Sequence, residues 1–280
     1  MTKSTGHLPG ADFSLAGRVA IITGGAGLLG VRHAEAIAAA GGIPVIADLR
    51  GAEAHSSAEK IAETYGVPAF GARVDITSAI SVETLLATVQ ARLGRVDILV
   101  NNAANNPKVE GSGEDFSRFE NFTLDQWNAD LAVGLTGAFI CAQVIGRSMA
   151  AAKRGVIVNI SSEYGMIAPD QRLYHKEGVP DDQQPAKPVS YTVVKAGLHG
   201  LTLYLATYWA AAGVRVNTIT VGGVNNGQSA EFVDRASSRI PLGRMAHQSD
   251  FQGALVYLCS DAASFVTGAN LVVDGGKSVW

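Results

Sequence analysis

The sequence predicts an α/β protein built on one doubly wound, parallel, seven-stranded sheet. Short apolar runs alternate with longer segments of helical period, and these runs are continuously apolar, as in strands buried on both faces. The chain has 280 residues, a length that one such domain accommodates. No shift in composition or low-complexity linker divides it. We therefore expect an N-terminal extension over residues 1–14 and a single domain over residues 15–280.

Composition and charge exclude several classes of protein. Hydrophobic residues make up 47% and charged residues 17%, which indicates a globular chain rather than a disordered one. The net charge is −3 and no Lys/Arg block is present, so nucleic acid is not an expected partner. The N-terminus lacks an apolar signal core, and the longest uncharged run is too short to span a membrane. Cys141 and Cys259 form no CxxC pair. We expect buried free thiols in a cytoplasmic protein.

The order of the elements follows from these runs. The expected strands are residues 19–23, 43–47, 69–74, 96–100, 156–160, 214–219 and 271–273. The expected helices are residues 31–40, 53–65, 78–93, 123–152, 189–212, 231–238 and 250–259. Ligands of such sheets bind at the carboxyl ends of the strands, so the segments after each strand are where a site is expected.

A glycine-rich turn joins the first strand to the first helix. Gly25, Gly27 and Gly30 have the G-x-G-x-x-G spacing. One glycine permits the sharp turn, one lets the backbone approach a pyrophosphate, and one lets the helix pack closely on the strand. Backbone N–H groups at the helix N-terminus then face the phosphates. The turn therefore predicts a dinucleotide site.

Asp48 ends the second strand, 18 residues beyond Gly30. A carboxylate there is expected to bind the adenosine ribose hydroxyls of NAD and to repel the 2′-phosphate of NADP. Arg50 partly offsets this repulsion, and a turn-capping role for Asp48 is the structural alternative. Asp75 has the matching place after the third strand, where adenine contact and N-capping of the next helix are both open.

Two segments carry the expected chemistry. Ser161 and Ser162 end the fifth strand, and Tyr191 and Lys195 lie four residues apart, on one face of a helix. A free tyrosine has a pKa of about 10, too high for a base at neutral pH. A neighbouring ammonium and a positive nicotinamide ring favour the phenolate. A Tyr–Lys pair is thus suited to moving the proton of an alcohol, with Ser162 bonding the same oxygen.

Together these motifs resemble the short-chain dehydrogenase/reductase family over residues 15–276. The matching segments are Thr23-Gly24…Gly30, Asn101-Asn102-Ala103, Ser161-Ser162, Tyr191…Lys195, Gly222-Gly223-Val224 and Thr267-Gly268…Asp274-Gly275-Gly276. The resemblance implies a Rossmann fold, a proton donor and acceptor at Tyr191, and an NAD cofactor. It implies that the cofactor contacts Gly24, Gly27, Leu28, Leu29, Asp48, Leu49, Asp75, Ile76, Asn102, Ala103, Ala104, Tyr191, Lys195, Val224 and Asn226.

Four positions depart from the family pattern. Leu28 stands where the short branch keeps glycine, which gives the turn the spacing of the nucleotide-sugar branch. Gly134 replaces the asparagine of the catalytic tetrad, whose main-chain carbonyl holds a relay water. Val221 replaces a proline, and Ala104 replaces a glycine. None of these changes removes a group that must react.

The substrate is expected at a long loop. Ser162 and Tyr191 are 29 residues apart, so residues 163–188 must lie at the mouth of the site. Arg172, His175 and Lys176 are suited to an anionic group, although a solvated loop is the alternative. Tyr164 lies in a Ser-x-Tyr-Gly segment that resembles nucleotide-sugar relatives. Tyr164 and Arg172 are therefore the expected substrate contacts, with a sugar or sugar phosphate as the hypothesis.

The sequence thus predicts an NAD-dependent enzyme that interconverts a secondary alcohol and a ketone. A catalytically weak dinucleotide sensor or scaffold, and an NAD-dependent epimerase or dehydratase, stay open as alternatives. His33 and His199 have no ligand cluster near them in sequence, so they are expected to be structural and no metal is expected. The resemblance implies a dimer or tetramer formed through the long helices 123–152 and 189–212.

Overall fold

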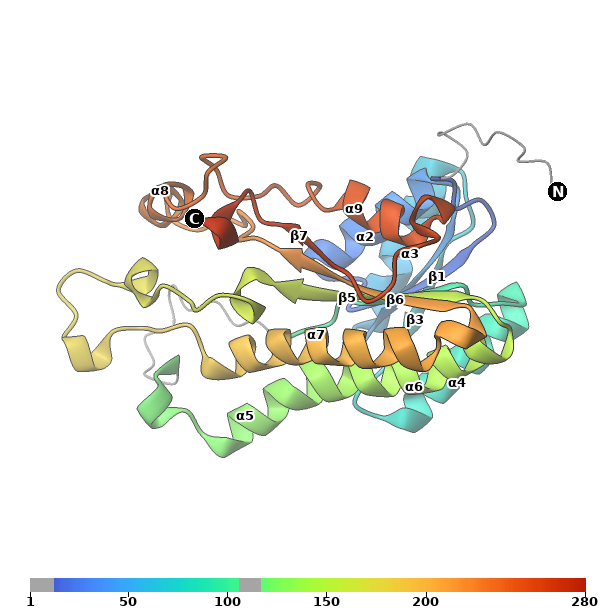
Figure 1. The fold of residues 1–280 in the computed structure, drawn as a ribbon, viewed down its shortest axis with the longest axis horizontal. Helices are drawn as coiled ribbons and strands as arrows, with labels where there is room; N and C mark the ends of the chain where they lie inside the picture. The colour runs from blue at the N-terminus through green and yellow to red at the C-terminus, as the bar shows by residue number, and fades with distance from the viewer. Residues whose placement is uncertain (1–12, 106–116) are drawn as a thin grey trace.

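The computed structural model describes residues 13–105 and 117–280 (Figure 1). The predicted extension, apart from its last two residues, and most of the connection from Asn105 to Phe122 lie outside the described residues. The strands form one parallel sheet in the order β3-β2-β1-β4-β5-β6-β7. This order reverses between β1 and β4, as in a doubly wound fold, and confirms the predicted fold class.

The elements follow the predicted sequence order. The strands are β1 Val19–Thr23, β2 Ile43–Asp48, β3 Phe70–Arg73, β4 Ile98–Asn101, β5 Gly155–Ser162, β6 Val214–Val221 and β7 Asn270–Val273. The α-helices are α2 Leu28–Ala39, α3 Gly51–Tyr65, α4 Ala79–Leu93, α5 Leu124–Leu131, α6 Gly137–Ala151, α7 Val189–Tyr208, α8 Ala230–Ser237 and α9 Gln252–Cys259.

Helices cover both faces of the sheet. Figure 1 shows α2, α3 and α9 on one side of the strands and α4, α6 and α7 on the other. Successive residues of a strand point to opposite faces, so neighbouring isoleucines of β1 enter different cores. Ile22 packs in the core that holds Leu255 of α9, whereas Ile21 packs in the core that holds Ile145 of α6. Burial on both faces explains why the strands are continuously apolar.

The predicted end of the fifth strand is wrong, because polar residues take part in the sheet there. The fifth strand was expected to end at residue 160, but β5 continues to Ser162. The ladder continues because Ser161 pairs with Thr220 and Ser162 with Val221 of β6. Hydrophobicity alone misses these residues, since backbone pairing does not require apolar side chains.

The predicted helix over residues 123–152 contains a π-helical turn, Ala132–Thr136, between α5 and α6. Ser190 of α7 donates a 2.5 Å hydrogen bond to Asp130, so α5 is tied to α7 beside this turn. By length and composition the whole run, Leu124–Ala151, is apolar enough to cross a membrane, but half of the tested window is buried. Cys141 and Met149 of α6 are fully buried in the core, which accounts for the apolar composition.

His33 of α2 is fully buried, and neither ring nitrogen has a hydrogen-bond partner among the described residues. Burial lowers the pKa of this imidazole to about 4, because charging it would leave a desolvated cation. The folded state therefore disfavours protonation of His33. Above the pKa of the unfolded state the imidazole is neutral in both states, so its titration does not change the free energy of unfolding. As the pH falls from about 6.5 to 4, the free energy of unfolding drops by about 3 kcal/mol.

We expect His33→Leu to remove this part of the acid sensitivity. The measurement is urea unfolding at pH 7.5 and pH 4.5, compared with the unmodified protein. His55→Leu, on the exposed surface of α3, is the matched control and should leave the difference between the two pH values unchanged. Equal acid losses in His33→Leu and the unmodified protein would contradict the prediction.

Candidate active site

A cavity of about 660 Å³ lies at the carboxyl ends of the strands. It extends from the glycine turn, past the ends of β2 to β6, to α8 and the end of the chain. Every residue predicted to contact the cofactor lines it, as do the predicted catalytic residues. The sequence therefore predicted one wall of a real cavity, at the place where open α/β sheets bind ligands.

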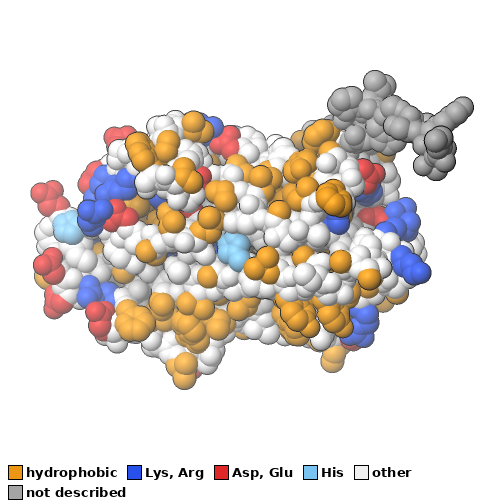
Figure 2. All heavy atoms as spheres, in the orientation of Figure 1, with side chains coloured by type: hydrophobic (Ala, Val, Ile, Leu, Met, Phe, Trp, Pro, Cys, Tyr) orange, Lys and Arg blue, Asp and Glu red, His pale blue; other side chains and the backbone are white. Residues whose placement is uncertain are grey.

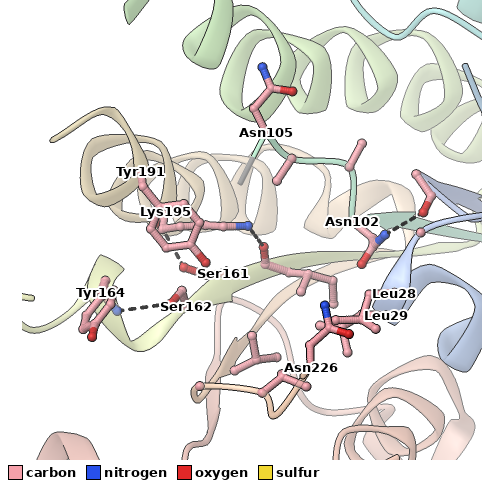
Figure 3. A pocket seen from close by; sticks show the side chains of 18 of the residues that line it. Leu28, Leu29, Asn102, Asn105, Ser161, Ser162, Tyr164, Tyr191, Lys195 and Asn226 are labelled. Carbon is pink, nitrogen blue, oxygen red and sulfur yellow. Dashed lines mark hydrogen bonds between the residues drawn. The ribbon is translucent and has the colours of Figure 1, made fainter. Parts of the chain in front are cut away.

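The glycine turn is shaped by close backbone approach. Gly24 has a φ of +60°, and a Cβ built on it would lie 2.8 Å from Cα of Ala103, so a side chain is excluded there. The Asn102 side chain donates hydrogen bonds to the carbonyls of Thr23 (3.0 Å) and Gly24 (3.1 Å) (Figure 3). The segment after β4 thus fixes the turn after β1.

The N-terminus of α2 opens into the cavity. Its N-cap residue, Gly27, makes no side-chain cap, and the first turn contains no acidic residue. Leu28 and Leu29 line the cavity from this turn, and the Leu28 side chain is partly exposed. Backbone N–H groups and the helix dipole at such an end favour an anion. This donor set fits the pyrophosphate of a dinucleotide.

Asp48 lies at the end of β2, where its carboxylate is nearly buried. It accepts hydrogen bonds from the backbone N–H groups of Ala26 (3.1 Å) and Arg50 (3.0 Å). The Arg50 guanidinium lies 3.3 Å from the same carboxylate and is half exposed. The carboxylate is therefore held between the glycine turn and a cation, and one edge of the cavity carries both charges.

Asp75 lines the cavity beside Ile76, but it does not cap α4. The N-cap of α4 is Ser78, so the N-cap alternative for Asp75 is wrong. Asp75 instead accepts hydrogen bonds from the hydroxyl (2.6 Å) and backbone N–H (2.9 Å) of Thr77. The hydroxyl bond is the main reason that the pKa of Asp75 is lowered.

Ser162, Tyr191 and Lys195 converge on one region of the cavity (Figure 3). The Ser162 hydroxyl lies near the Tyr191 side chain and opposes the rise of its pKa. The Lys195 ammonium lies 5.7 Å from the centre of the Tyr191 ring and donates a 2.8 Å hydrogen bond to the carbonyl of Ile160. The end of β5 and the start of α7 therefore bring together the three groups that the sequence singled out.

Burial dominates the electrostatics of this trio. It raises the pKa of Tyr191 to about 12, and the Ser162 hydroxyl opposes this only in part. Burial lowers the pKa of Lys195 to about 8, and the charge of Lys187 adds to the effect. At neutral pH Tyr191 is thus a phenol, a proton donor suited to the carbonyl of a ketone.

Lys187 is a neighbour that the sequence reasoning missed. Its ammonium lies over the Tyr191 ring, 3.9 Å from the ring centre, and it lines the cavity. An ammonium over an aromatic face is attracted by the ring and favours a negative charge on the phenol oxygen. The only available signal was its position four residues before Tyr191, which indicates nothing until the loop is folded.

A side-chain contact fixes α7 against β5. The hydroxyl of Ser161 donates to the carbonyl of Lys195 (2.8 Å) and lies 3.1 Å from the His199 ring. His199 thus has a place in the packing of the site, as the sequence suggested for a structural histidine. Among the residues described in the structure, no group of three His, Cys, Asp or Glu side chains is placed to hold a metal ion.

The substrate side differs from the prediction at Arg172. Tyr164 lines the cavity, but Arg172 is not among the lining residues, and its side chain is 83% exposed. Its guanidinium pairs with both oxygens of Asp170 and is the main cause that lowers the pKa of Asp170 to about 2. His175 and Lys176 line a second, smaller cavity of about 280 Å³. These three predicted basic residues therefore lie outside the cavity of the catalytic trio, whereas Lys187 of the same loop lines it.

Other lining residues came from segments that carry no motif. The missed wall includes Glu163, Leu173, Tyr174, Lys187, Phe232, Ala236, Ile240, Met245 and Lys277. Most of these are ordinary apolar or aromatic residues of the loop, of α8 and of the segment after α8, so no sequence signal separates them from core residues.

Comparison with known proteins places the chain in a family. Residues 18–175 match the family model described as short chain dehydrogenase, and residues 181–278 match the model described as enoyl-(acyl carrier protein) reductase. The chain belongs to the short-chain dehydrogenase/reductase family, as the sequence motifs implied. It is an oxidoreductase that acts on CH–OH groups, and its family binds a nicotinamide dinucleotide.

Three similar proteins span nearly the whole chain. D-threitol dehydrogenase of Mycolicibacterium smegmatis is 34% identical over 96% of this chain and 95% of its own. NADP-dependent mannitol dehydrogenase of Alternaria alternata is 32% identical over 95% of this chain and 94% of its own. The structure of a gluconate 5-dehydrogenase from Burkholderia cenocepacia in complex with NADP and tartrate is 29% identical, covers 97% of this chain and 99% of its own, and has a TM-score of 0.84.

Gly134, which replaces the family asparagine, lies buried in the π-helical turn. A Cβ built on it would lie 2.5 Å from a methyl carbon of Val194 on α7. We expect Gly134→Asn to destabilise the protein by about 1–3 kcal/mol, because the stiff Val194 side chain must shift. Chemical denaturation measures this loss.

Gly200→Ala is the matched control for that experiment. Gly200 is also helical, but a Cβ there meets nothing within 4 Å. It should be neutral or stabilise by up to about 1 kcal/mol. Equal stabilities of Gly134→Asn and the unmodified protein would contradict the prediction, since the π-helical turn and α7 would then separate without cost.

Proposed function

We propose that the protein is an NAD(H)-dependent dehydrogenase that interconverts a secondary alcohol and a ketone, with Tyr191 as the acid and base. The observation that carries the proposal is the convergence of Ser162, Tyr191 and Lys195 on the cavity that the glycine turn also lines. The cavity thus supports a dinucleotide and a small substrate side by side.

The roles of the side chains follow from their chemistry. A bound nicotinamide supplies or accepts the hydride. The Tyr191 phenol donates its proton to the substrate oxygen during ketone reduction and takes it back during alcohol oxidation. The Ser162 hydroxyl bonds the same oxygen. The ammonium groups of Lys195 and Lys187 stabilise the phenolate that forms when the proton leaves.

Tyr191→Phe tests the proposal. Removal of the hydroxyl should lower kcat by at least about 100-fold, since it removes the proton donor. Cofactor binding, measured by titration of protein fluorescence with NADH, should stay within a few fold. A Phe variant as active as the unmodified protein would contradict the assignment of Tyr191.

We further propose NAD rather than NADP as the cofactor. Asp48 places a carboxylate at the edge where the adenosine ribose is expected, and a 2′-phosphate there would meet its charge. Two of the compared proteins are named or solved with NADP, so the proposal depends on this chain's own Asp48. Arg50 beside it is the feature that favours NADP.

Asp48→Asn and Arg50→Gln should therefore change cofactor preference in opposite directions. We expect Asp48→Asn to lower the ratio of kcat/KM for NAD over NADP by about 10- to 100-fold, because it removes the repulsive charge. Arg50→Gln should raise the ratio. Both are measured by steady-state kinetics, and an unchanged ratio in Asp48→Asn would place the ribose contact elsewhere.

A polyol or sugar is the proposed substrate class. Two of the compared proteins are named for the polyols threitol and mannitol, and the third for the sugar acid gluconate. Tyr164 keeps its predicted place in the cavity, whereas the exposed, paired Arg172 gives no support for a phosphate contact. An activity assay that follows both product and NADH distinguishes the alternative functions. A sensor or scaffold gives no turnover, whereas an epimerase or dehydratase forms product without net NADH.

We also propose a homo-oligomer. Leu203, Tyr204 and Tyr208 of α7 and Phe139 of α6 are each about half or more exposed. Figure 2 shows hydrophobic side chains gathered over the lower, helical part of this face. Such a patch is suited to a second copy of the chain. Light scattering distinguishes a dimer from a tetramer.

A cytoplasmic setting is proposed on the thiols. Cys141 and Cys259 are both free and buried, as the sequence predicted. Buried unpaired thiols are compatible with a reducing compartment.

A further inference from the structure

The end of the chain forms one wall of the substrate side of the cavity. After β7, Gly275 and Gly276 adopt φ values of +69° and +89°, which turn the chain back toward the sheet. The Asp274 carboxylate accepts hydrogen bonds from the backbone N–H groups of Gly276 and Ser278, each at 2.8 Å. Lys277, held between them, lines the cavity with its side chain only 11% exposed.

The Lys277 ammonium contacts the two residues that directly follow Ser162. It forms an ion pair with Glu163, whose side chain is 2% exposed. It lies 3.5 Å from the Tyr164 hydroxyl and 4.8 Å from the centre of the Tyr164 ring. Glu163, Tyr164 and Lys277 together form a polar wall beside the catalytic serine, in contact with the cavity.

Several other residues of the substrate side are apolar. Leu173, Phe232, Ile240 and Met245 line the cavity and pack in one cluster. Beside these apolar side chains, the polar wall supplies buried hydrogen-bonding groups that can orient a hydroxylated molecule.

The charge balance of the polar wall indicates which ligand it suits. Burial lowers the pKa of Lys277, but the Glu163 carboxylate and the Tyr164 hydroxyl, which accept hydrogen bonds from it, outweigh burial and raise the pKa overall, so the ammonium persists at neutral pH. Burial raises the pKa of Glu163 and the Lys277 ammonium opposes that rise, so the two groups balance each other as an ion pair or as a shared proton. Either way the pair has little net charge, which favours a neutral ligand over an anion. An ammonium has three N–H donors, and Lys277 uses two of them for Glu163 and Tyr164. The Tyr164 hydroxyl, which accepts from Lys277, can also donate a hydrogen bond to a ligand.

We propose that Lys277 and Tyr164 form a hydroxyl-binding subsite that selects substrates with a second hydroxyl next to the reacting carbon. Lys277 is then a specificity-determining residue, and vicinal diols and polyols are favoured over simple secondary alcohols. A substrate lacking the second hydroxyl would cover the ammonium and the phenol without replacing their bonds to water, which costs affinity. The inference rests on the proposed alcohol oxidation.

The test compares 2,3-butanediol with 2-butanol, which share a carbon chain and differ in one hydroxyl. Because Lys277→Met alone would leave the Glu163 carboxylate buried without its partner, the variant is the double change Glu163→Gln/Lys277→Met. Arg172→Gln removes a cation outside the cavity and is the matched control. Circular dichroism and the thermal midpoint establish that each variant is folded.

We expect the unmodified protein and Arg172→Gln to prefer the diol. In the double variant, kcat/KM for 2,3-butanediol should fall by about 10- to 100-fold, while kcat/KM for 2-butanol stays within about twofold. An equal fall for both alcohols would show a structural role, and an unchanged ratio would show no contact. Either result overturns the proposal.

Failure of the proposed function has a different signature. If the unmodified protein oxidises neither alcohol with NAD or NADP, the dehydrogenase assignment fails for this pair. Calorimetric titration of 2,3-butanediol into the protein–NADH complex then decides the subsite. Binding that is lost in the double variant supports it, and absent or unchanged binding overturns it.

Discussion

Strands β5 and β6 pair over eight residues, from Gly155 opposite Val214 to Ser162 opposite Val221, and the site depends on this pairing. The ladder carries the chain beyond its last apolar residue and ends at Ser162, so the hydroxyl that we propose to be catalytic is presented from a rigid strand end. Ser161, one residue earlier, points to the other face and bonds the backbone of α7 at Lys195. A single ladder thereby sets the distance between the serine and the Tyr–Lys helix.

The same edge of the sheet concentrates charge where little water reaches. Two ammonium groups, Lys187 and Lys195, lie near one phenol, and burial opposes the ionisation of Tyr191 and Lys195 alike. The repulsion between the two ammonium groups is offset when the phenol gives up its proton, since a phenolate attracts both of them. The arrangement therefore stores part of the driving force for proton transfer in the positions of side chains that need not move.

The fold and the cofactor side were largely predictable from the sequence, because both depend on local patterns. Some motifs can be interpreted without knowledge of tertiary contacts. Examples are glycines at a tight turn, an acidic residue at a strand end, and a tyrosine four residues before a lysine. Leu28 and Gly134 were visible as departures for the same reason.

The substrate side was not predictable, because it is assembled from distant segments. Lys277 contacts Glu163 across 114 residues of sequence, and nothing near either residue marks the contact. Arg172 was predicted to contact the substrate and Lys187 of the same loop was not considered, yet Arg172 pairs with Asp170 and Lys187 lines the cavity. Which basic residue faces inward depends on the path of the loop, which sequence patterns do not contain.

The π-helical turn at Ala132–Thr136 has a consequence for how this chain tolerates changes in length. A π turn holds one residue more than an α turn. Deleting one residue there would restore regular α geometry and leave α5 in nearly the same orientation relative to α6, because one wide turn and one α turn rotate the chain almost equally. Asp130 would then still face Ser190. Deleting a residue of α6 instead would rotate α5 by about 100° and break this hydrogen bond, so the π turn is the place where this long helix can lose a residue and keep its contact with the helix that bears Tyr191.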